Sequence, residues 1–178
     1  MDSTVKEKEE KLKSDLFSSN ENLVLKALAA IKEEGTRNLV EPILELLIHS
    51  ESEDIKNTVL SFLSEIKISD VDHLFIQKLE NPDFKPYRQQ LVSCMWNSGL
   101  NPTDDLHVLC RLACEEDYMT ALEVLTLVEN MEGPFDHDSL TEAYSEVSVY
   151  MNEANPDDPK LGLIQSLYEI LYAFQEAN

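Results

Sequence analysis

The sequence predicts an all-α fold, an α-solenoid of about four antiparallel helix pairs that is closed by a C-terminal helix. Apolar residues recur at helical spacing in blocks of 10 to 15 residues, and no block alternates like a β-strand. Short breaks such as Ser50–Ser52, Asn81–Pro82 and Gly99–Pro102 separate the blocks. With only 4 Gly and 7 Pro, the chain has few residues for the many tight turns of a sandwich or barrel.

An internal repeat is the second observation, because matching positions of successive blocks lie 32 residues apart. A unit of this length that holds two helices cannot bury its apolar stripes alone, so successive units must stack and share one core. The repeat therefore favours a stack of helix pairs. The series that keep the spacing over three copies are Leu23, Ile55 and Tyr87; Ala27, Val59 and Leu91; Ile31, Leu63 and Met95; and, at the turns, Gly35, Lys67 and Gly99.

The blocks place the individual helices along the chain. A last helix over 159–176 follows a proline-rich turn, with Asp158 suited to the N-cap and Pro159 to the first helical position. Its strongly apolar stripe is typical of a helix that caps the end of a stack. Residues 1–18 form a charged segment that we expect to be partly helical or frayed, and residues 19–178 form one domain with the capping helix. The other helices are expected over 21–34, 37–48, 53–66, 69–80, 86–98, 103–116, 117–131 and 136–152.

Two stretches carry a pattern found in a known family of helical repeats. Asp54-Ile55-Lys56 and Asp83 with Tyr87-Arg88 place an acidic residue in a turn, followed by an apolar-basic pair and further apolar residues. The pattern, over roughly residues 20–132, resembles the HEAT-repeat family; armadillo-like and other helical-pair repeats remain alternatives. The resemblance implies a right-handed α-solenoid with the second helix of each pair on the inner face. It brings no catalytic residues with it, since the family has none in common.

The charge excludes some classes of partner. Lys and Arg number 14 and Asp and Glu 35, a formal net charge of −21, of which −15 falls from Gly99 onward. Such a surface repels phosphate backbones and anionic lipid, so we expect neither nucleic acid nor a membrane as a direct partner. The charged run from Met1 to Asp15 lacks the apolar segment of a secretory signal, and three cysteines are an odd number. Free thiols and a cytoplasmic location are therefore expected.

The best candidate for metal chemistry is the set His107, Cys110 and Cys114. Offsets of three and seven residues place these side chains on one helix face, and thiolate with imidazole suits zinc or copper. The alternative is that both cysteines fill the core, since the sequence supplies neither a fourth ligand nor a C-x-x-C pair. Carboxylates at Asp136, Asp138 and further along the same helix are expected to form a solvated face. No phosphate-binding glycine loop or catalytic triad motif occurs, so we expect neither an enzyme nor a bound cofactor.

The leading hypothesis for function is a non-enzymatic scaffold or adaptor that binds another protein, with a basic surface or segment, on its inner helical face. An acidic inhibitor or immunity-type protein that mimics nucleic acid is the alternative, and a metal- or thiol-dependent enzyme at Cys110 and Cys114 is the third hypothesis. The apolar last helix could also pair two copies of the chain. The 32-residue register predicts a partner-binding surface of Glu53, Lys56, Asn57, Ser61, Gln89, Gln90, Ser93, Asn97, Thr120, Glu123 and Thr126.

Overall fold

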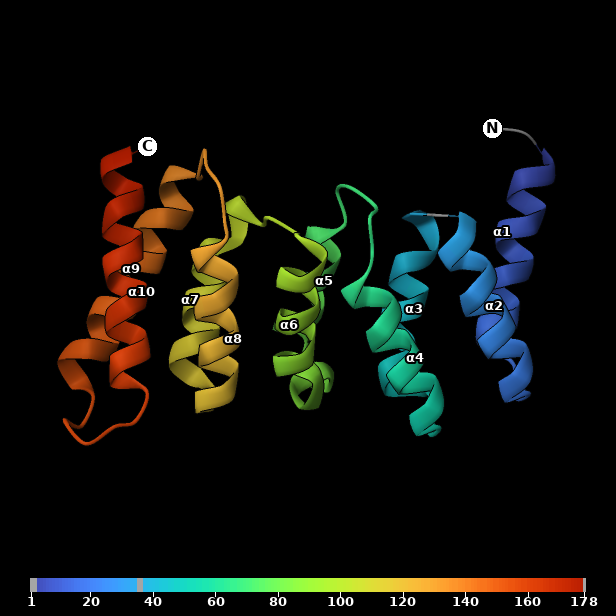
Figure 1. Cartoon of the computed structure of the whole chain (residues 1–178), viewed down its shortest axis with the longest axis horizontal. Coiled ribbons are helices and arrows are strands. Elements are labelled where there is room, and N and C mark those ends of the chain that lie inside the picture. Colours follow the sequence, from blue (N-terminus) through green and yellow to red (C-terminus); the bar gives the residue numbers. More distant parts are fainter. Residues whose placement is uncertain (1–2, 35–36, 178) are drawn as a thin grey trace. The chain divides into compact units, whose positions relative to one another are not determined.

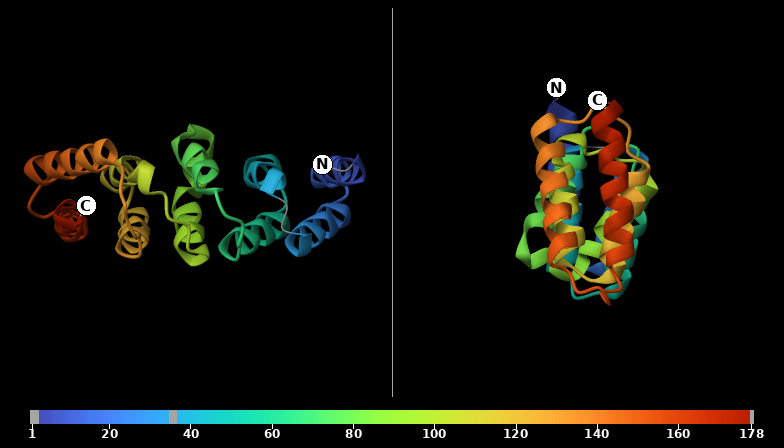
Figure 2. Two further views of the ribbon diagram at one scale, coloured as in Figure 1. Left: turned by 90° about the horizontal axis from the view of Figure 1, so that it is seen from above. Right: turned by 90° about the vertical axis from the view of Figure 1, so that its left-hand side faces the viewer.

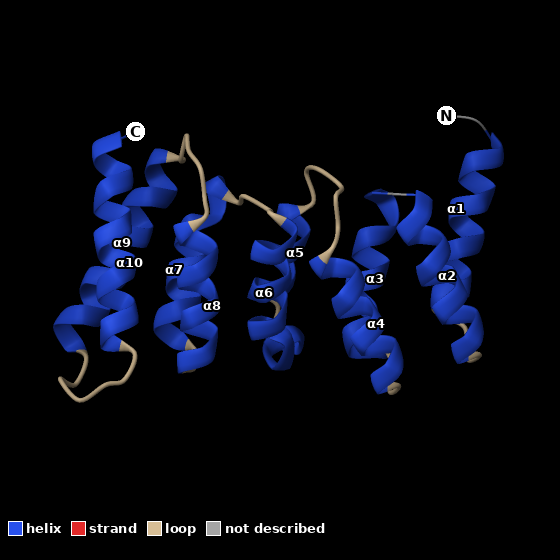
Figure 3. Cartoon of the chain, viewed as in Figure 1, coloured by secondary structure: helices blue, strands red, loops and turns tan. Residues whose placement is uncertain are grey.

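A computed structural model describes residues 3–34 and 37–177 of the chain, and all the regular elements in these ranges are helices (Figures 1 and 3). The prediction of an all-α fold is therefore confirmed. The contacts divide the chain into two compact units, an N-terminal unit (Met1–Tyr87) and a C-terminal unit (Arg88–Asn178). No helix in the described ranges is both long enough and apolar enough to span a bilayer.

Over its described residues, the N-terminal unit holds five α-helices: α1 (Ser3–Leu16), α2 (Glu21–Glu34), α3 (Val40–His49), α4 (Glu53–Ser64) and α5 (Asp72–Glu80). Within this unit α1, α3 and α5 lie in one layer and α2 and α4 in the other (Figure 2). A short 3₁₀ segment, Arg37–Leu39, leads into α3, and a second one, Pro82–Tyr87, follows α5. The apolar stripes of the two layers meet in a core that includes Leu28, Ile43 and Phe75.

The C-terminal unit, which the structure describes over residues 88–177, also holds five α-helices there: α6 (Arg88–Ser98), α7 (Leu106–Glu115), α8 (Tyr118–Glu129), α9 (His137–Glu153) and α10 (Leu161–Ala177). Here α6, α8 and α10 form one layer, and α7 and α9 form the other (Figure 2). Contacts between α7 and α9 and between α6 and α8 join successive helix pairs within the unit. This alternation of first and second helices is what the repeat predicts. The superhelical path over the whole chain, and the grouping of 19–178 into one domain, stay predictions.

The helices lie close to where the sequence places them, with differences of one to three residues at their ends. The helices predicted over 53–66 and 117–131 end two residues earlier, at Ser64 and Glu129, and the helix predicted from residue 69 begins at Asp72. The helix predicted over 21–34 is α2, which has the same bounds. The helices predicted to begin at residues 37 and 103 begin at Val40 and Leu106, because a 3₁₀ turn occupies the first three residues of each. The predicted glycine break at residue 35 lies outside the described residues. The prediction that Asp158 is the N-cap and Pro159 the first helical residue is wrong, because α10 begins two residues later, at Leu161. The Asp158 carboxylate accepts the backbone N–H of Lys160 at 2.8 Å and so stabilises the turn that precedes the helix.

The segment expected to be partly helical or frayed forms a regular helix over the described residues 3–16. Leu12 and Leu16 of α1 are buried, and α1 packs against α2 and α3. The charged residues between them occupy the opposite side of the helix, in keeping with an amphipathic element. The segment therefore belongs to the N-terminal unit.

The turn at Gly99 is one that the repeat predicts. Gly99 ends α6 with a φ of +76°, which glycine adopts without steric cost. The N–H of Leu100 donates to the carbonyl of Met95 at 3.0 Å, the bond that closes a glycine-capped helix end. Next to it, the Asn101 side chain donates to the carbonyl of Glu132 at 2.7 Å and accepts from the Glu132 N–H at 3.0 Å. This two-bond clamp ties the loop after α6 to the loop after α8.

Candidate functional site: the exposed faces of α4, α6 and α8

In the N-terminal unit, the predicted surface residues follow one side of α4. Glu53, Asn57 and Ser61 are exposed and Lys56 is half-buried. Lys56 Nζ lies 2.9 Å from Glu53 Oε1 and 6.0 Å from the centre of the Tyr87 ring. Hydrogen bonding to Glu53 and to Tyr87 raises the pKa of Lys56, so the amine stays charged. The two charges of this row therefore balance one another, and the row is polar without a dominant sign.

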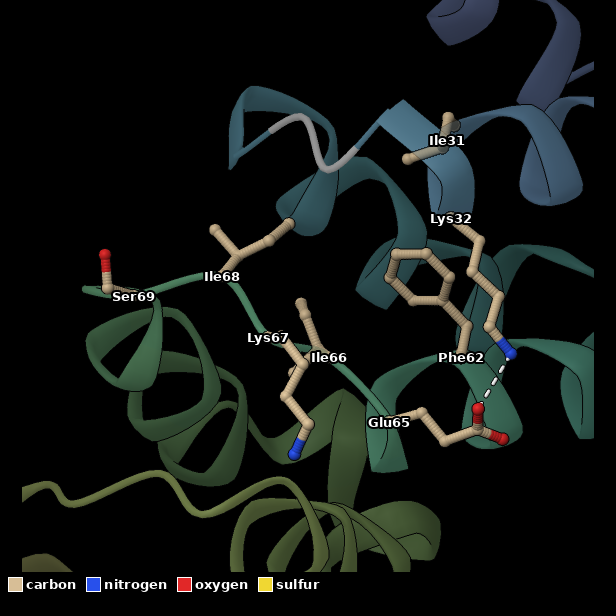
Figure 4. A pocket seen from close by; sticks show the side chains of 8 residues that line it. All are labelled: Ile31, Lys32, Phe62, Glu65, Ile66, Lys67, Ile68 and Ser69. Atoms are coloured by element: carbon tan, nitrogen blue, oxygen red, sulfur yellow. Dashed lines mark hydrogen bonds and ion pairs between the residues drawn. The ribbon is translucent and has the colours of Figure 1, made fainter.

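Ser61 also lines a small cavity, of about 200 Å³, between α2 and α4. A second cavity of about 410 Å³ lies beside it, and both are lined by Lys32 and Phe62. Lys32 and Glu65 form an ion pair of 2.9 Å that crosses from α2 to α4 at this point (Figure 4). Half or more of each of these two side chains is exposed, so water screens the pair strongly. The result is a surface groove with an apolar floor and charges of both signs at its mouth.

In the C-terminal unit, the predicted residues of α6 lie on its solvent side. Gln90 and Asn97 are exposed, and Gln89 and Ser93 are half-buried. The amide of Asn97 donates to the Ser93 carbonyl at 2.8 Å, which holds it along the helix surface. All four predicted positions of α6 can therefore be reached from solvent.

On α8 the prediction is wrong for one of three residues. Glu123 and Thr126 are half-buried, but Thr120 is only 4% exposed and lies on the core side with Val124 and Leu127. At 3.6 residues per turn, steps of three residues place Thr120 about 120° around the helix from Thr126. Residues chosen at every third position of α8 therefore do not all lie on one side of the helix, and Thr120 falls on the core side.

The structure adds residues to this surface that the prediction omits. Trp96 is half-buried, and its indole N–H donates to Glu123 Oε2 at 2.7 Å, joining α6 to α8. Met119 is 45% exposed, and Leu122 is half-buried on the same helix. Trp96 lies seven residues after Gln89, a spacing that places both on one side of α6 and could have identified it. We use the name α6/α8 face for Gln89, Ser93, Trp96, Met119, Leu122, Glu123 and Thr126.

The α6/α8 face contrasts with the unit that carries it. The C-terminal unit has 3 basic and 17 acidic residues, a formal charge of −14. Glu123 is the one charged member of the face, and its carboxylate accepts the indole hydrogen bond. Exposed carboxylates instead lie at the two ends of α8: Glu115 and Asp117 precede the helix, Glu129 is its last residue and Glu132 follows it. The face is thus a nearly uncharged centre, with an aromatic side chain, between two acidic ends.

Two further charges near the N-terminal end of α8, those of Arg88 and Glu116, neutralise one another. Arg88 Nη1 and Glu116 Oε1 form a hydrogen-bonded ion pair, and each side chain is only 14% exposed. A pair in this geometry contributes little net charge to the surface. The exposed carboxylates at that end are Glu115 and Asp117, and the nearby ammonium of Lys160 acts on the Asp117 carboxylate.

The cysteines have the properties of core residues. Cys94 and Cys110 are buried, and burial raises the pKa of the Cys110 thiol well above its ordinary value. Burial also raises the pKa of Cys114 to about 11, although the charge of Lys160 opposes the shift. A nucleophilic or metal-binding cysteine needs the opposite shift, since the thiolate is the reactive form. The core-filling alternative accounts for these positions.

The ring nitrogens of His107 lie next to residues of α9 and not next to Cys110 or Cys114 in a metal-binding arrangement. Its Nδ1 lies 3.0 Å from the Ser139 hydroxyl, which also accepts the His107 backbone N–H at 3.2 Å. Its Nε2 lies 4.0 Å from Glu142 on α9. Within residues 3–34 and 37–177, no three His, Cys, Asp or Glu side chains are arranged to hold a metal ion.

The carboxylates of the acidic strip, which are expected to form a solvated face, lie at the start of α9 and along it. Asp136 is the N-cap residue, and its side chain accepts the Ser139 N–H at 2.8 Å. Asp138, Glu142 and Glu146 are exposed at four-residue intervals along the helix that follows. Carboxylates at this spacing lie about 6 Å apart along one side of the helix.

Comparisons with protein-family models, with curated proteins and with solved structures returned no significant match. The resemblance to HEAT repeats consequently rests on the residues quoted above, and it stays a prediction.

Proposed function

We propose that this protein is a non-enzymatic adaptor that binds a partner protein with a basic surface through the α6/α8 face. The observation that carries the proposal is the uncharged, Trp96-containing centre of this face in a unit of formal charge −14. Charged residues are depleted from the centres of protein interfaces, where tryptophan is enriched. The acidic ends of α8 complement basic residues on the partner and favour fast, salt-dependent association.

Trp96 has the features of an interface anchor. Its hydrogen bond to Glu123 fixes the orientation of the indole before any partner arrives, so little side-chain freedom remains to be lost on binding. Truncating a tryptophan near the centre of an interface commonly weakens the free energy of binding by about 2–4 kcal/mol. The polar members Gln89, Ser93 and Thr126 surround it with groups that can donate and accept hydrogen bonds.

Affinity capture from cells that naturally contain the protein tests this proposal, with washes at low and at moderate salt. The wild-type chain should retain a basic protein at low salt that Trp96→Ala does not retain. Tyr172→Ala is the matched control, since Tyr172 is an aromatic residue of α10 that is 53% exposed and outside the face. Equal retention by wild type and Trp96→Ala would remove the α6/α8 face from the proposal.

A second candidate function is favoured by the exposed acidic strip of α9. Asp138, Glu142 and Glu146 present a row of carboxylates without a basic residue on the helix, as a protein that imitates a phosphate backbone requires. In that case the captured partner would be a nucleic-acid-binding protein. Adding duplex DNA should release it, and Glu142→Gln with Glu146→Gln should weaken its retention more than Trp96→Ala does.

A further inference from the structure

We infer that the α6/α8 face takes an extended segment of the partner in which two basic clusters flank an uncharged, partly apolar stretch of about five or six residues. The inference rests on the proposed function and adds to it the chemistry and the spacing of the bound segment. Charge complementarity with the two acidic ends of α8 and the length of α8 carry it.

The two ends of the face define where the basic clusters must lie. Glu115 and Asp117 are exposed before α8, and Glu129, its last residue, and Glu132 are exposed at the other end. Between them, the face carries only the carboxylate of Glu123, which already accepts the Trp96 indole N–H. A basic residue opposite Met119 or Leu122 would lose water without gaining a partner, which is costly. Basic residues are therefore accommodated at the ends and apolar or neutral residues in the middle.

The length of α8 gives the distance between the clusters. Tyr118–Glu129 is a helix of 12 residues, which at 1.5 Å per residue spans about 18 Å. An extended peptide advances about 3.3 Å per residue, so five or six residues cover this distance. A helical segment would need about twelve residues, since its rise equals that of α8.

The polar members of the face favour the extended form. Gln89 and Ser93 of the face, with Gln90 next to them on α6, offer amide and hydroxyl groups to solvent. A helical ligand satisfies its backbone groups internally, whereas an extended ligand presents N–H and C=O groups that need partners. The side-chain amides of the face supply both donors and acceptors to such a backbone.

The experiment uses the one tryptophan of the chain, Trp96, as a reporter of binding at this face. The full chain is titrated with synthetic peptides that hold an Arg-Arg pair at each end and two, five or nine Leu and Ser residues between them. The peptides contain neither Trp nor Tyr, and the indole emission is followed. The five-residue peptide should bind about tenfold more tightly than the two-residue peptide, because the shorter one reaches a single acidic end at a loss of about 1.4 kcal/mol. The nine-residue peptide should bind more weakly than the five-residue peptide, because its middle must loop out.

Variants of equal charge change show whether the ends of α8 set the spacing. Glu129→Gln with Glu132→Gln should abolish the preference for five residues, whereas Glu169→Gln with Glu176→Gln on α10 should keep it. Tight binding that is insensitive to spacing would overturn this inference and leave the proposed function standing. If no peptide alters the Trp96 emission and calorimetry detects no heat of binding, both the inference and the proposed α6/α8 face are wrong.

Discussion

The ammonium group of Lys160 lies 2.6 Å from the carbonyl oxygen of Glu116, although 44 residues separate the two in the chain. The same group donates to the carbonyls of Cys114 at 2.7 Å and Ala113 at 3.2 Å. The last carbonyls of a helix have no intrahelical partners, and α7 ends at this point. Lys160, which also lies 5.0 Å from the centre of the Tyr150 ring, therefore caps the C-terminus of α7 from the segment that precedes α10.

Replacing Lys160 with Met should destabilise the C-terminal unit by about 1–3 kcal/mol, because it leaves carbonyls of α7 without a charged donor. Lys26→Met, at an exposed position of α2, is the control for loss of one lysine and should change little. Denaturant unfolding followed by Trp96 emission reports on the C-terminal unit. Equal midpoints for Lys160→Met and wild type would show that water replaces these hydrogen bonds without loss.

The N-cap of α8 should make stability depend on acid pH. Asp117 accepts the Thr120 N–H at 2.8 Å, and this backbone hydrogen bond lowers the pKa of the carboxyl group. A carboxyl group with a lowered folded pKa stabilises the protein above its unfolded pKa of about 4, and the contribution is lost as the pH falls through the folded value. Asp117→Ala should therefore cost about 1 kcal/mol at neutral pH and less at strongly acid pH.

Asp117→Asn distinguishes the contribution of the N-cap hydrogen bond from that of the carboxylate charge. The amide oxygen of Asn can still accept the Thr120 N–H, so this variant should stay close to wild type at neutral pH and show no titration of the cap. The measurement is the free energy of unfolding of both variants at pH 7 and at pH 3. A cost of Asp117→Ala that stays constant between the two pH values would contradict the role given to the carboxylate.

Two ion pairs of similar chemistry should differ in their effect on stability because they differ in burial. The Lys78 side chain is 9% exposed and bonds to Glu45 and Glu41, with its ammonium 5.6 Å from the centre of the Phe84 ring. Burial lowers the pKa of Lys78, but the hydrogen bonds and charges of the two glutamates outweigh it, so the pKa is raised overall. Lys78→Met should lower the free energy of unfolding by about 1–3 kcal/mol, because it leaves two carboxylates beside an apolar side chain.

The comparison is Lys32→Met, which removes the exposed pair with Glu65 and should leave the unfolding midpoint unchanged. Both lysines belong to the N-terminal unit, so thermal unfolding followed by circular dichroism measures the two variants under one protocol. Similar losses for Lys32→Met and Lys78→Met would mean that burial does not set the strength of these pairs.

The thiols should react slowly while the protein is folded. Because burial raises the pKa of Cys114 to about 11, only about one molecule in a thousand carries its thiolate at pH 8. Iodoacetamide at pH 8 should modify the native chain far more slowly than the chain in guanidinium chloride. Mass spectrometry of tryptic peptides measures Cys114 on the peptide 112–160, and fragmentation of the peptide 89–111 separates Cys94 from Cys110. Rapid labelling of Cys110 or Cys114 in the native chain would revive a thiol-based activity.

Part of the candidate site followed from helical periodicity and part did not. Gln90, Asn97 and Asn57 are exposed as predicted, because each lies opposite an apolar stripe that the sequence displays. Thr120, by contrast, is buried. The prediction is wrong there because a polar side chain near the start of a helix does not reveal which side of the helix faces the core. The sequence prediction leaves out Trp96 because an aromatic residue inside an apolar run is typical of a core, whereas the structure shows it half-buried and hydrogen-bonded to Glu123.

By itself, the sequence determined the all-α class, the order and approximate bounds of the helices, and the glycine turn after α6. These properties depend on local spacing and backbone conformation, which the order of residues specifies directly. The tertiary structure alone decided that Lys160 caps α7, that Asn101 clamps the loop after α8, and that Trp96 stands in an uncharged face between acidic ends. Each of these relationships joins residues that lie 27 to 47 positions apart in the chain, and the stacking of the helices, not any local pattern, brings them together.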